Sequence, residues 1–347
     1  MRVFATVPQE DLRRVGAAAR AIEAEGYDGI VAMENKHDPF LALAVAGAAT
    51  RRIELHTGVA IAFARTPMAV AEVGWDLAGS TGGRFVLGLG SQVRAHIERR
   101  YGSEFAHPGP RLREYVLAVK QIFRSFRTGE PLAVDGEFYN LSLLPAMWSP
   151  GPIDVSDPPV DIAAVNPWML RMAGEVADGV HVHPLNTPIY LRETVLPELA
   201  AGAARSGRSV DDLEVIVPAF LCVGDTDEEQ DRWREMARVQ VAFYGSTPNY
   251  AFIFEQLDRE GTTERIRERQ RAGDIAGMAA VIDDDILVNF TTTGTWDDIA
   301  DEIVAKYGGI ATRVVSYFTG SDVVRDPAAF ERWGTLAKAV RAKSASF

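Results

Sequence analysis

The sequence has 347 residues, of which 47% are hydrophobic, so it is long enough to bury a substantial core. Its formal net charge of -12 is the opposite of the basic balance that a general nucleic-acid binder needs. A single cysteine excludes an intramolecular disulfide framework, and no apolar run approaches the roughly 18–20 residues of a membrane span. Because the first residues also lack the apolar region of a signal peptide, we expect a cytoplasmic protein without nucleic-acid or membrane partners.

Short apolar strands and amphipathic helices alternate from the start of the sequence. The hydrophobic pattern predicts helices that Gly26 and the Gly82-Gly83 pair end, and that Asp38 and Pro67 begin. The expected strands are 3–7, 29–33, 53–61 and 84–89, and the expected helices between them are 9–25, 40–50 and 68–80.

The alternation continues less regularly in the rest of the chain. A stretch rich in proline and glycine, 135–159, is expected to form a long excursion, and 245–285 is mostly polar and helical. The expected strands here are 160–165, 179–182, 213–223 and 313–318, and the clearest helices are 111–126, 167–176, 188–206 and 327–343.

Eight strands alternating with helices predict an α/β fold, a (β/α)8 TIM barrel, whose usual size of about 250 residues grows with insertions. We expect one domain over residues 1–347, with insertions after strands four and seven. The alternative is an open doubly wound sheet, which needs a glycine-rich phosphate loop after its first strand. The turn at 8–11, Pro-Gln-Glu-Asp, contains no glycine, which favours the barrel.

In such a barrel the active site lies where the strands end, at the carboxyl face. The second strand ends in Glu34 and is followed by His37, and the sixth ends in the His181-Val182-His183 run. The fourth strand ends in a small polar turn, Gly90-Ser91-Gln92, where the glycine lets the backbone approach a ligand closely. These strand ends are therefore the candidate site.

Three blocks of sequence resemble the bacterial luciferase-like family, and most closely its branch that uses coenzyme F420, a deazaflavin hydride carrier. They are AMENKHDPFLALAVAGAAT, TGVAIAFARTPMAVAEVGWDLAGSTGGRFVLGLGSQ and AAVNPWMLRMAGEVADGVHVHP. The resemblance extends from Met1 to about Phe318. It implies a (β/α)8 barrel with a flavin-like ring in its mouth, a small-molecule substrate and a homodimer.

The resemblance also assigns cofactor contacts to particular positions. In the family, a bulge with a non-proline cis peptide backs the ring, and the matching bond is Gly58-Val59, followed by Ala60. The ring and its side chain are held by the turn after strand four. The remaining cofactor-binding positions that the resemblance implies are Gly90, Ser91, Gln92, Ala164, Val165, Asn166 and His181.

The sequence departs from the family pattern at two positions. F420-dependent relatives place a glutamate as candidate proton donor just after strand four, where this chain has Val93. Flavin-dependent relatives place an arginine for the FMN phosphate near Ser91, and Arg94 is its only near substitute, which weakens the FMN alternative. Proton transfer must then come from other strand ends.

Glu34, His37 and His183 are the candidate catalytic residues. Glu34 matches the family's acidic residue after strand two, and His37 can replace a histidine that faces the ring. A structural role is the alternative for each: Glu34 as a hydrogen-bonding group and His37 as a neighbour of the helix start. His181 and His183, two apart on a strand, share one side and could also bind a metal, but matching ligands are missing, so no metal is expected.

The resulting hypothesis is an F420-dependent oxidoreductase that transfers a hydride between the deazaflavin and a small organic substrate. One alternative is an FMN-dependent monooxygenase that uses O2 and reduced flavin from a partner reductase. Others are a non-catalytic flavin- or deazaflavin-binding protein and a metal-dependent hydrolase. The apolar second and third helices are the expected interface of the homodimer.

Overall fold

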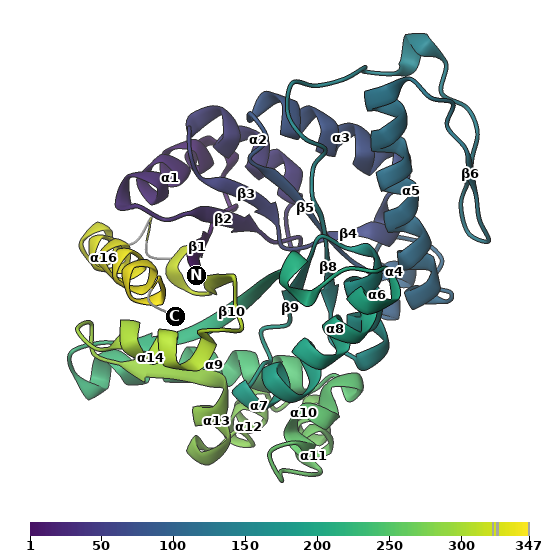
Figure 1. The fold of residues 1–347 in the computed structure, drawn as a ribbon. Coiled ribbons are helices and arrows are strands. Elements are labelled where there is room, and N and C mark those ends of the chain that lie inside the picture. The colour runs from purple at the N-terminus through teal and green to yellow at the C-terminus, as the bar shows by residue number, and fades with distance from the viewer. Residues whose placement is uncertain (321–322, 324–325, 346–347) are drawn as a thin grey trace.

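Eight parallel strands close into a ring at the centre of the protein, confirming the predicted (β/α)8 barrel (Figure 1). The computed structural model describes residues 1–320, 323 and 326–345. Neighbouring strands pair in sequence order, and pairing of the last strand with the first closes the ring. The ring strands are β1 (Arg2–Thr6), β2 (Gly29–Ala32), β3 (Glu54–Thr57), β5 (Phe85–Gly90), β8 (Val160–Ala164), β9 (Gly179–Val182), β10 (Glu214–Val223) and β12 (Arg313–Ser316).

Helices cover the outside of the ring, and their apolar faces pack against the outward side chains of the strands (Figure 1). Asp38 and Asn166 cap their helices by accepting hydrogen bonds from backbone N–H groups in the first turn. These helices are α1 (Leu12–Glu25), α2 (Pro39–Ala49), α3 (Pro67–Ser80), α5 (Pro108–Thr128), α6 (Pro167–Val176), α8 (Leu196–Arg205), α14 (Ile299–Tyr307) and α16 (Pro327–Ser344).

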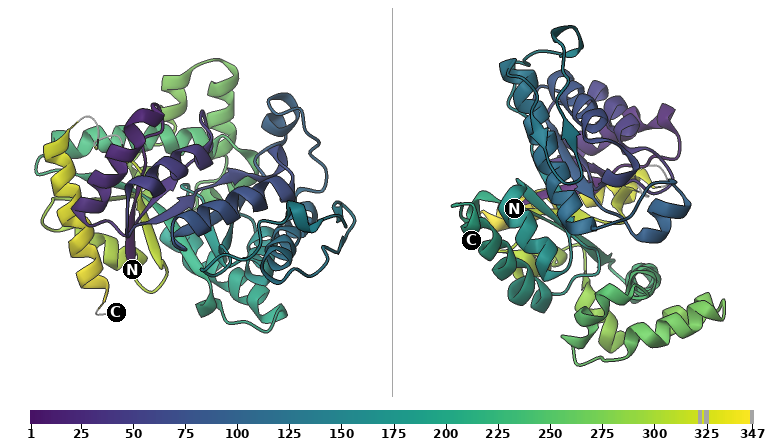
Figure 2. Two further views of the ribbon diagram at one scale, coloured as in Figure 1. Left: turned by 90° about the horizontal axis from the view of Figure 1, so that it is seen from above. Right: turned by 90° about the vertical axis from the view of Figure 1, so that its right-hand side faces the viewer.

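The connection from β5 to β8 leaves the barrel and returns along its side (Figures 1 and 2). It begins with the short helix α4 (Arg94–Arg99) and continues into α5. A hairpin of β6 (Val134–Asp135) and β7 (Asn140–Leu141) follows, and then a 3-10 turn, η2 (Ala146–Trp148). Glu114 of α5 holds the hairpin by accepting backbone hydrogen bonds from residues 137–139.

The connection from β10 to β12 contains a group of helices that projects from the barrel in the right-hand view of Figure 2. An additional strand, β11 (Thr291–Gly294), pairs with the carboxyl half of β10 outside the ring. The helical elements are α9 (Asp227–Gly245), η5 (Pro248–Tyr250), α10 (Ala251–Glu255), α11 (Thr262–Arg271), α12 (Ile275–Ala280) and α13 (Asp284–Phe290).

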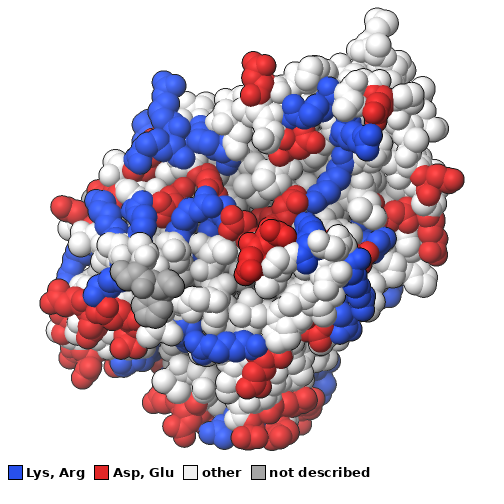
Figure 3. Space-filling view, in the orientation of Figure 1, with Lys and Arg blue, Asp and Glu red and all other residues white. Residues whose placement is uncertain are grey.

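Shorter elements complete the chain between β9 and β10. They are α7 (Pro188–Tyr190), the π-helical turn η3 (Leu191–Val195) and η4 (Val210–Asp212). Among the described residues, no helix combines the length and the apolar composition needed to cross a membrane. Acidic and basic side chains are interspersed over the face drawn in Figure 3, and the described part of that face has no continuous basic stripe.

The inside of the barrel is polar at the end where the strands begin. Arg313, only 6% exposed at its side chain, pairs with Glu54 at 3.0 Å and also with Glu214. Arg2 pairs with the same two carboxylates from the more exposed side. Above these ion pairs lies a small apolar cluster of Phe4, Val31, Ile216 and Val315.

Candidate functional site

The third barrel strand is interrupted at the carboxyl face. The Gly58–Val59 peptide bond is cis, as the resemblance implies, and the chain then resumes as β4 (Ala60–Ile61). Ala60 and Ile61 of β4 pair with Leu89 and Gly90 at the end of β5. The bulge and the turn after β5 are therefore direct neighbours at the mouth of the barrel.

Glycines allow neighbouring segments to pack closely in this part of the mouth. A Cβ at Gly90 would lie 2.7 Å from Cγ2 of Val59, and a Cβ at Gly58 would overlap the side chain of Val31. After Gly90, Gln92 has a φ of 56°, a left-handed conformation that few non-glycine residues adopt and that is enriched at functional sites. We call Gly90, Ser91 and Gln92, together with the bulge at Gly58 and Val59, the cofactor ledge.

Glu34 is fully engaged next to the cofactor ledge. Its side chain is 5% exposed and pairs with Arg65 at 2.7 Å. It also accepts a 2.7 Å hydrogen bond from the backbone N–H of Ile61 and a 3.3 Å bond from the hydroxyl of Tyr101. Arg65 extends the network to Asp38, the cap of α2. These contacts favour the structural alternative, in which the carboxylate holds the bulge and α2 in register.

The two other candidate catalytic residues lie in different surroundings. His37 is exposed at the surface, one residue before the cap of α2. His183 is half-buried, and its ring packs against the rings of Tyr244 and Tyr250, with centroids 4.7 and 4.6 Å away. Of the two histidines, His183 is the one whose ring is held by aromatic neighbours.

The protonation of His183 follows from its hydrogen bond and its burial. Its Nδ1 accepts a 3.0 Å hydrogen bond from the backbone N–H of Leu185, so the proton of the neutral ring sits on Nε2. Burial lowers the pKa of His183 to about 3. At neutral pH the residue is therefore an uncharged imidazole with an Nε2–H donor.

The end of β8 offers mainly backbone groups. Ala164 is 2% exposed, with its side chain in the outer core, and the Val165 carbonyl accepts a 2.6 Å bond from Tyr190. Asn166 caps α6 by accepting a 2.9 Å hydrogen bond from the N–H of Met169, so its side-chain oxygen has a structural partner. Ala163, which sequence analysis missed, lies next to the cofactor ledge. A Cβ added at Gly90 would be 3.5 Å from the Cβ of Ala163.

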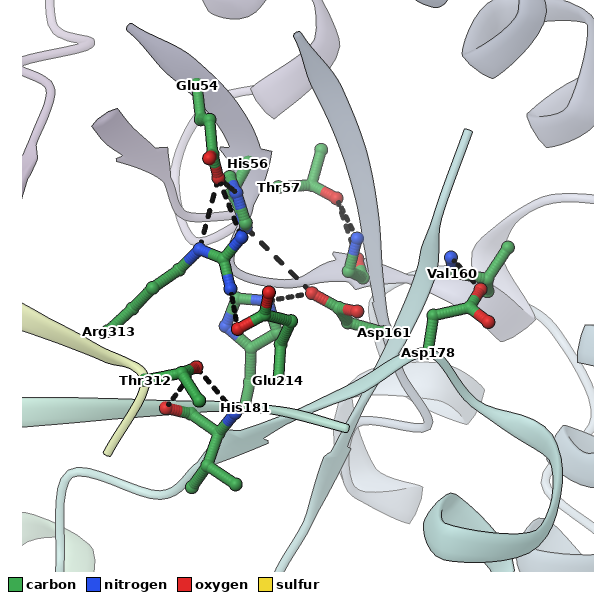
Figure 4. A network of polar contacts seen from close by, with 12 residues as sticks. Glu54, His56, Thr57, Val160, Asp161, Asp178, His181, Glu214, Thr312 and Arg313 are labelled. Carbon is green, nitrogen blue, oxygen red and sulfur yellow. Dashed lines mark hydrogen bonds and ion pairs between the residues drawn. The ribbon is translucent and has the colours of Figure 1, made fainter. Parts of the chain in front are cut away.

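His181 lies beneath the mouth rather than in it. It is 7% exposed, and its ring occupies the space that Gly88 leaves, since a Cβ there would lie 2.7 Å from its Nε2. Nε2 of His181 is 3.6 Å from Oδ2 of Asp161, and Nδ1 of His56 is 3.9 Å from the same oxygen (Figure 4). His181 and His183 thus occupy successive levels of the barrel.

Sequence analysis missed His56 and Asp161. The signal available was a polar side chain inside an apolar strand, at the spacing of two that places Glu54 and His56 on one side of β3. Burial raises the pKa of Asp161 to about 7 and, together with His56 and Arg313, lowers the pKa of His181 to about 3. Burial also lowers the pKa of His56, and Arg313 and Arg2 add to that shift.

A cis bond next to a glycine turn in the mouth of a parallel barrel is what the family resemblance implies, and comparison with known proteins confirms the family. Residues 2–313 match the family described as luciferase-like monooxygenase, and the chain belongs to that family. An uncharacterized protein of Mycobacterium tuberculosis is 39% identical over 318 residues, covering 92% of this chain and 93% of the relative.

Two further similarities concern named reductases. The 5,10-methylenetetrahydromethanopterin reductase of Archaeoglobus fulgidus is 29% identical over 300 residues, which is 84% of each chain. The solved structure of the coenzyme F420-dependent tetrahydromethanopterin reductase from Methanopyrus kandleri superposes with a TM-score of 0.75 and 22% identity, covering 96% of both chains. That structure supports the same barrel fold.

The space beside Gly88 gives a first prediction. In Gly88→Ala, the new methyl group would overlap the Thr57 carbonyl and press on His181, so we expect a loss of about 3 kcal/mol of unfolding free energy. Gly74→Ala in α3 is the matched control, because its Cβ would meet only ordinary contacts at 3.5 Å or more. There we expect no loss, or a gain of up to about 1 kcal/mol. Urea unfolding measures both, and equal stabilities would contradict the packing described.

Proposed function

We propose that the protein is an F420-dependent oxidoreductase that moves a hydride between the deazaflavin and a small organic substrate. The observation that carries the proposal is the cofactor ledge: a glycine turn packed directly against a cis bulge at the carboxyl face of the barrel. The named F420-dependent reductase of the same fold and the related methylenetetrahydromethanopterin reductase support this choice of cofactor. When bound, the deazaflavin supplies the hydride-carrying carbon.

The residues of this chain fit such a ring. Gly58, Val59 and Ala60 would back one face, and Gly90 lets the Val59 side chain pack directly against the end of β5 beside them. Ser91 and Gln92 would hold the edge of the ring and its side chain. At the neighbouring end of β8, the backbone N–H of Trp168 at the start of α6 would face a polar or anionic part of the cofactor, next to Ala164, Val165 and Asn166. His181 would support this floor from below.

We further propose that His183 is the residue that directs proton movement at the mouth. Val93 stands where F420-dependent relatives place an acid, and Glu34 is committed to Arg65 and Ile61. The Nε2–H of His183 remains as a donor aimed from an aromatic surround. A neutral imidazole can hold a substrate oxygen by hydrogen bonding and follow its change of charge. His37 is the second candidate.

The alternatives from sequence analysis predict different outcomes. An FMN-dependent monooxygenase, which the family description also allows, would bind FMN more tightly and would need O2 and a reductase. A non-catalytic cofactor-binding protein would bind F420 without turnover.

The cofactor prediction is tested by fluorescence or calorimetric titration with oxidised F420 and with FMN. We expect F420 to bind more tightly than FMN by about tenfold or more, which corresponds to about 1.4 kcal/mol. Gly90→Val, which pushes into Val59, should weaken F420 binding by about tenfold, whereas Gly74→Ala should bind like the natural protein. Tight FMN binding with no F420 binding would reject the proposal in favour of the monooxygenase.

The role of His183 is tested by turnover with reduced or oxidised F420 over a panel of alcohols, ketones and enones. We expect His183→Ala to lower kcat roughly a hundredfold while F420 affinity changes little, because only a transition-state contact is lost. His183→Gln, whose amide can replace the Nε2–H donor, should recover part of the rate. His96→Ala, an exposed residue of α4, serves as the control. If His183→Ala keeps its kcat and His37→Ala loses it, the role belongs to His37.

We also propose that two copies associate through α2 and α3. These helices expose Leu41 and Val45 on one and Val73 on the other, with Leu41 56% exposed. Light scattering should find a dimer that Leu41→Glu converts to a monomer, because the interface would then bury a carboxylate. Leu143→Glu in the β6–β7 region, where Leu143 is 78% exposed, is the matched control. A natural protein that is monomeric at assay concentrations would contradict this interface.

A further inference from the structure

Three polar atoms inside the barrel point at one another and have no hydrogen-bond partner among the described residues. They are Nδ1 of His56 on β3, Oδ2 of Asp161 on β8 and Nε2 of His181 on β9. All three residues are at least nine-tenths buried, and the three atoms lie within 4.8 Å of one another (Figure 4). Each unsatisfied buried polar atom lowers the free energy of unfolding by roughly 1–3 kcal/mol. A ligand bound between the three atoms would remove this cost.

The charges around this space leave one carboxylate unmatched. Arg2 and Arg313 pair with Glu54 and Glu214, which balances two positive against two negative groups. Asp161 accepts no contact from either arginine at ion-pair distance. All three facing atoms can offer an electron pair, so a cation is the species that they are suited to bind.

We propose that His56, Asp161 and His181 bind one divalent ion of a first-row transition metal inside the barrel, below the cofactor ledge. Two imidazole nitrogens and one carboxylate oxygen are a common ligand set for zinc, iron and related ions. The site is separate from the proposed site of hydride transfer, because the backbone at Gly58 and Gly88 lies between them. It also differs from the pair His181 and His183 that the sequence pattern brought to attention.

The second nitrogen of His56 strengthens the assignment. His56 Nε2 lies 3.0 Å from Oε2 of Glu54, and Glu54 is itself held by Arg313. Histidines that bind metals usually donate their other N–H to a carboxylate, which fixes the tautomer and makes the free nitrogen a better ligand. With Nε2 protonated and bonded to Glu54, the lone pair of His56 sits on Nδ1, the atom that faces the space.

The three atoms approach the spacing of an occupied site. Metal bonds of about 2.1 Å place two ligand atoms of a tetrahedral site about 3.4 Å apart. The separations from Asp161, 3.6 Å to His181 and 3.9 Å to His56, exceed that value by a few tenths of an ångström. The two histidine nitrogens, which lie within 4.8 Å of each other, would move closer together when an ion binds.

Metal content of the full-length protein tests the proposal. Since the site is enclosed, the ion must enter during folding, so the protein is produced in defined medium supplemented with zinc, iron, manganese and cobalt. Elemental analysis after gel filtration should find close to one equivalent of one of these metals per chain. Asp161→Asn and His181→Asn should lower that content by about tenfold or more. His96→Asn, which changes an exposed histidine of α4, should keep it.

A second measurement keeps the test independent of folding defects in the variants. Protein produced with cobalt should show the visible absorption of a Co2+ ion bound by nitrogen and oxygen ligands, and anomalous scattering should place the ion between the three residues. Natural protein with less than about a tenth of an equivalent of every metal would overturn the proposal. A water molecule found at that point in a crystal structure, with full hydrogen bonds to the triad, would overturn it as well. Neither readout involves F420, so failure here leaves the proposed function untouched.

Discussion

The rest of the barrel interior depends on the ion pairs of Arg313 at the end where the strands begin. Its guanidinium joins Glu54 of β3 to Glu214 of β10 across the inside of the ring, and both carboxylates are anchored in place. Burying such charges gains little net stability, but each lost partner would leave a buried charge, so the set tolerates only one strand register. Because Glu54 is fixed, His56 one level higher is fixed as well. The positions of His181 and of Gly88 above it follow from the same strand register.

Gly88 lies directly above this ordered set of side chains and below the surface that we propose binds the cofactor. Gly88 leaves space for the His181 ring below, and Thr57 closes the gap between β3 and β5 by bonding to both the N–H and the carbonyl of Gly88. Above this point the end of β5 and the bulge after β3 present Gly90 and Gly58, whereas the end of β9 presents His183. A planar ring can lie against such a surface, whereas in most barrels branched side chains fill this level. Along the barrel axis the interior residues thus change from ion pairs to imidazoles to glycines, and the glycines lie where we propose that the cofactor binds.

Local pattern was sufficient for most of the fold but not for the interior site. The alternation of apolar runs and caps predicted all eight ring strands, because each strand's burial is visible in its own residues. The additional strand β11 was missed, since Thr291–Gly294 carries no apolar alternation and pairs only through its backbone. The cis bond at Gly58 came from family resemblance alone. His56, Asp161 and His181 meet through the stagger of three strands, a relation between distant segments that no single stretch of sequence contains.

The two histidines of β9 show how one strand can serve two levels. Alternation places His181 and His183 on the same side of the strand, and sequence pattern treats them as a pair. In the folded barrel the first is enclosed with Asp161, while the second stands among Tyr244 and Tyr250 at the mouth. Burial keeps both rings uncharged, because the pKa of each is lowered to about 3. Their contacts nevertheless differ: Nδ1 of His183 accepts a hydrogen bond from the backbone N–H of Leu185, whereas Nε2 of His181 faces Asp161 in the barrel interior.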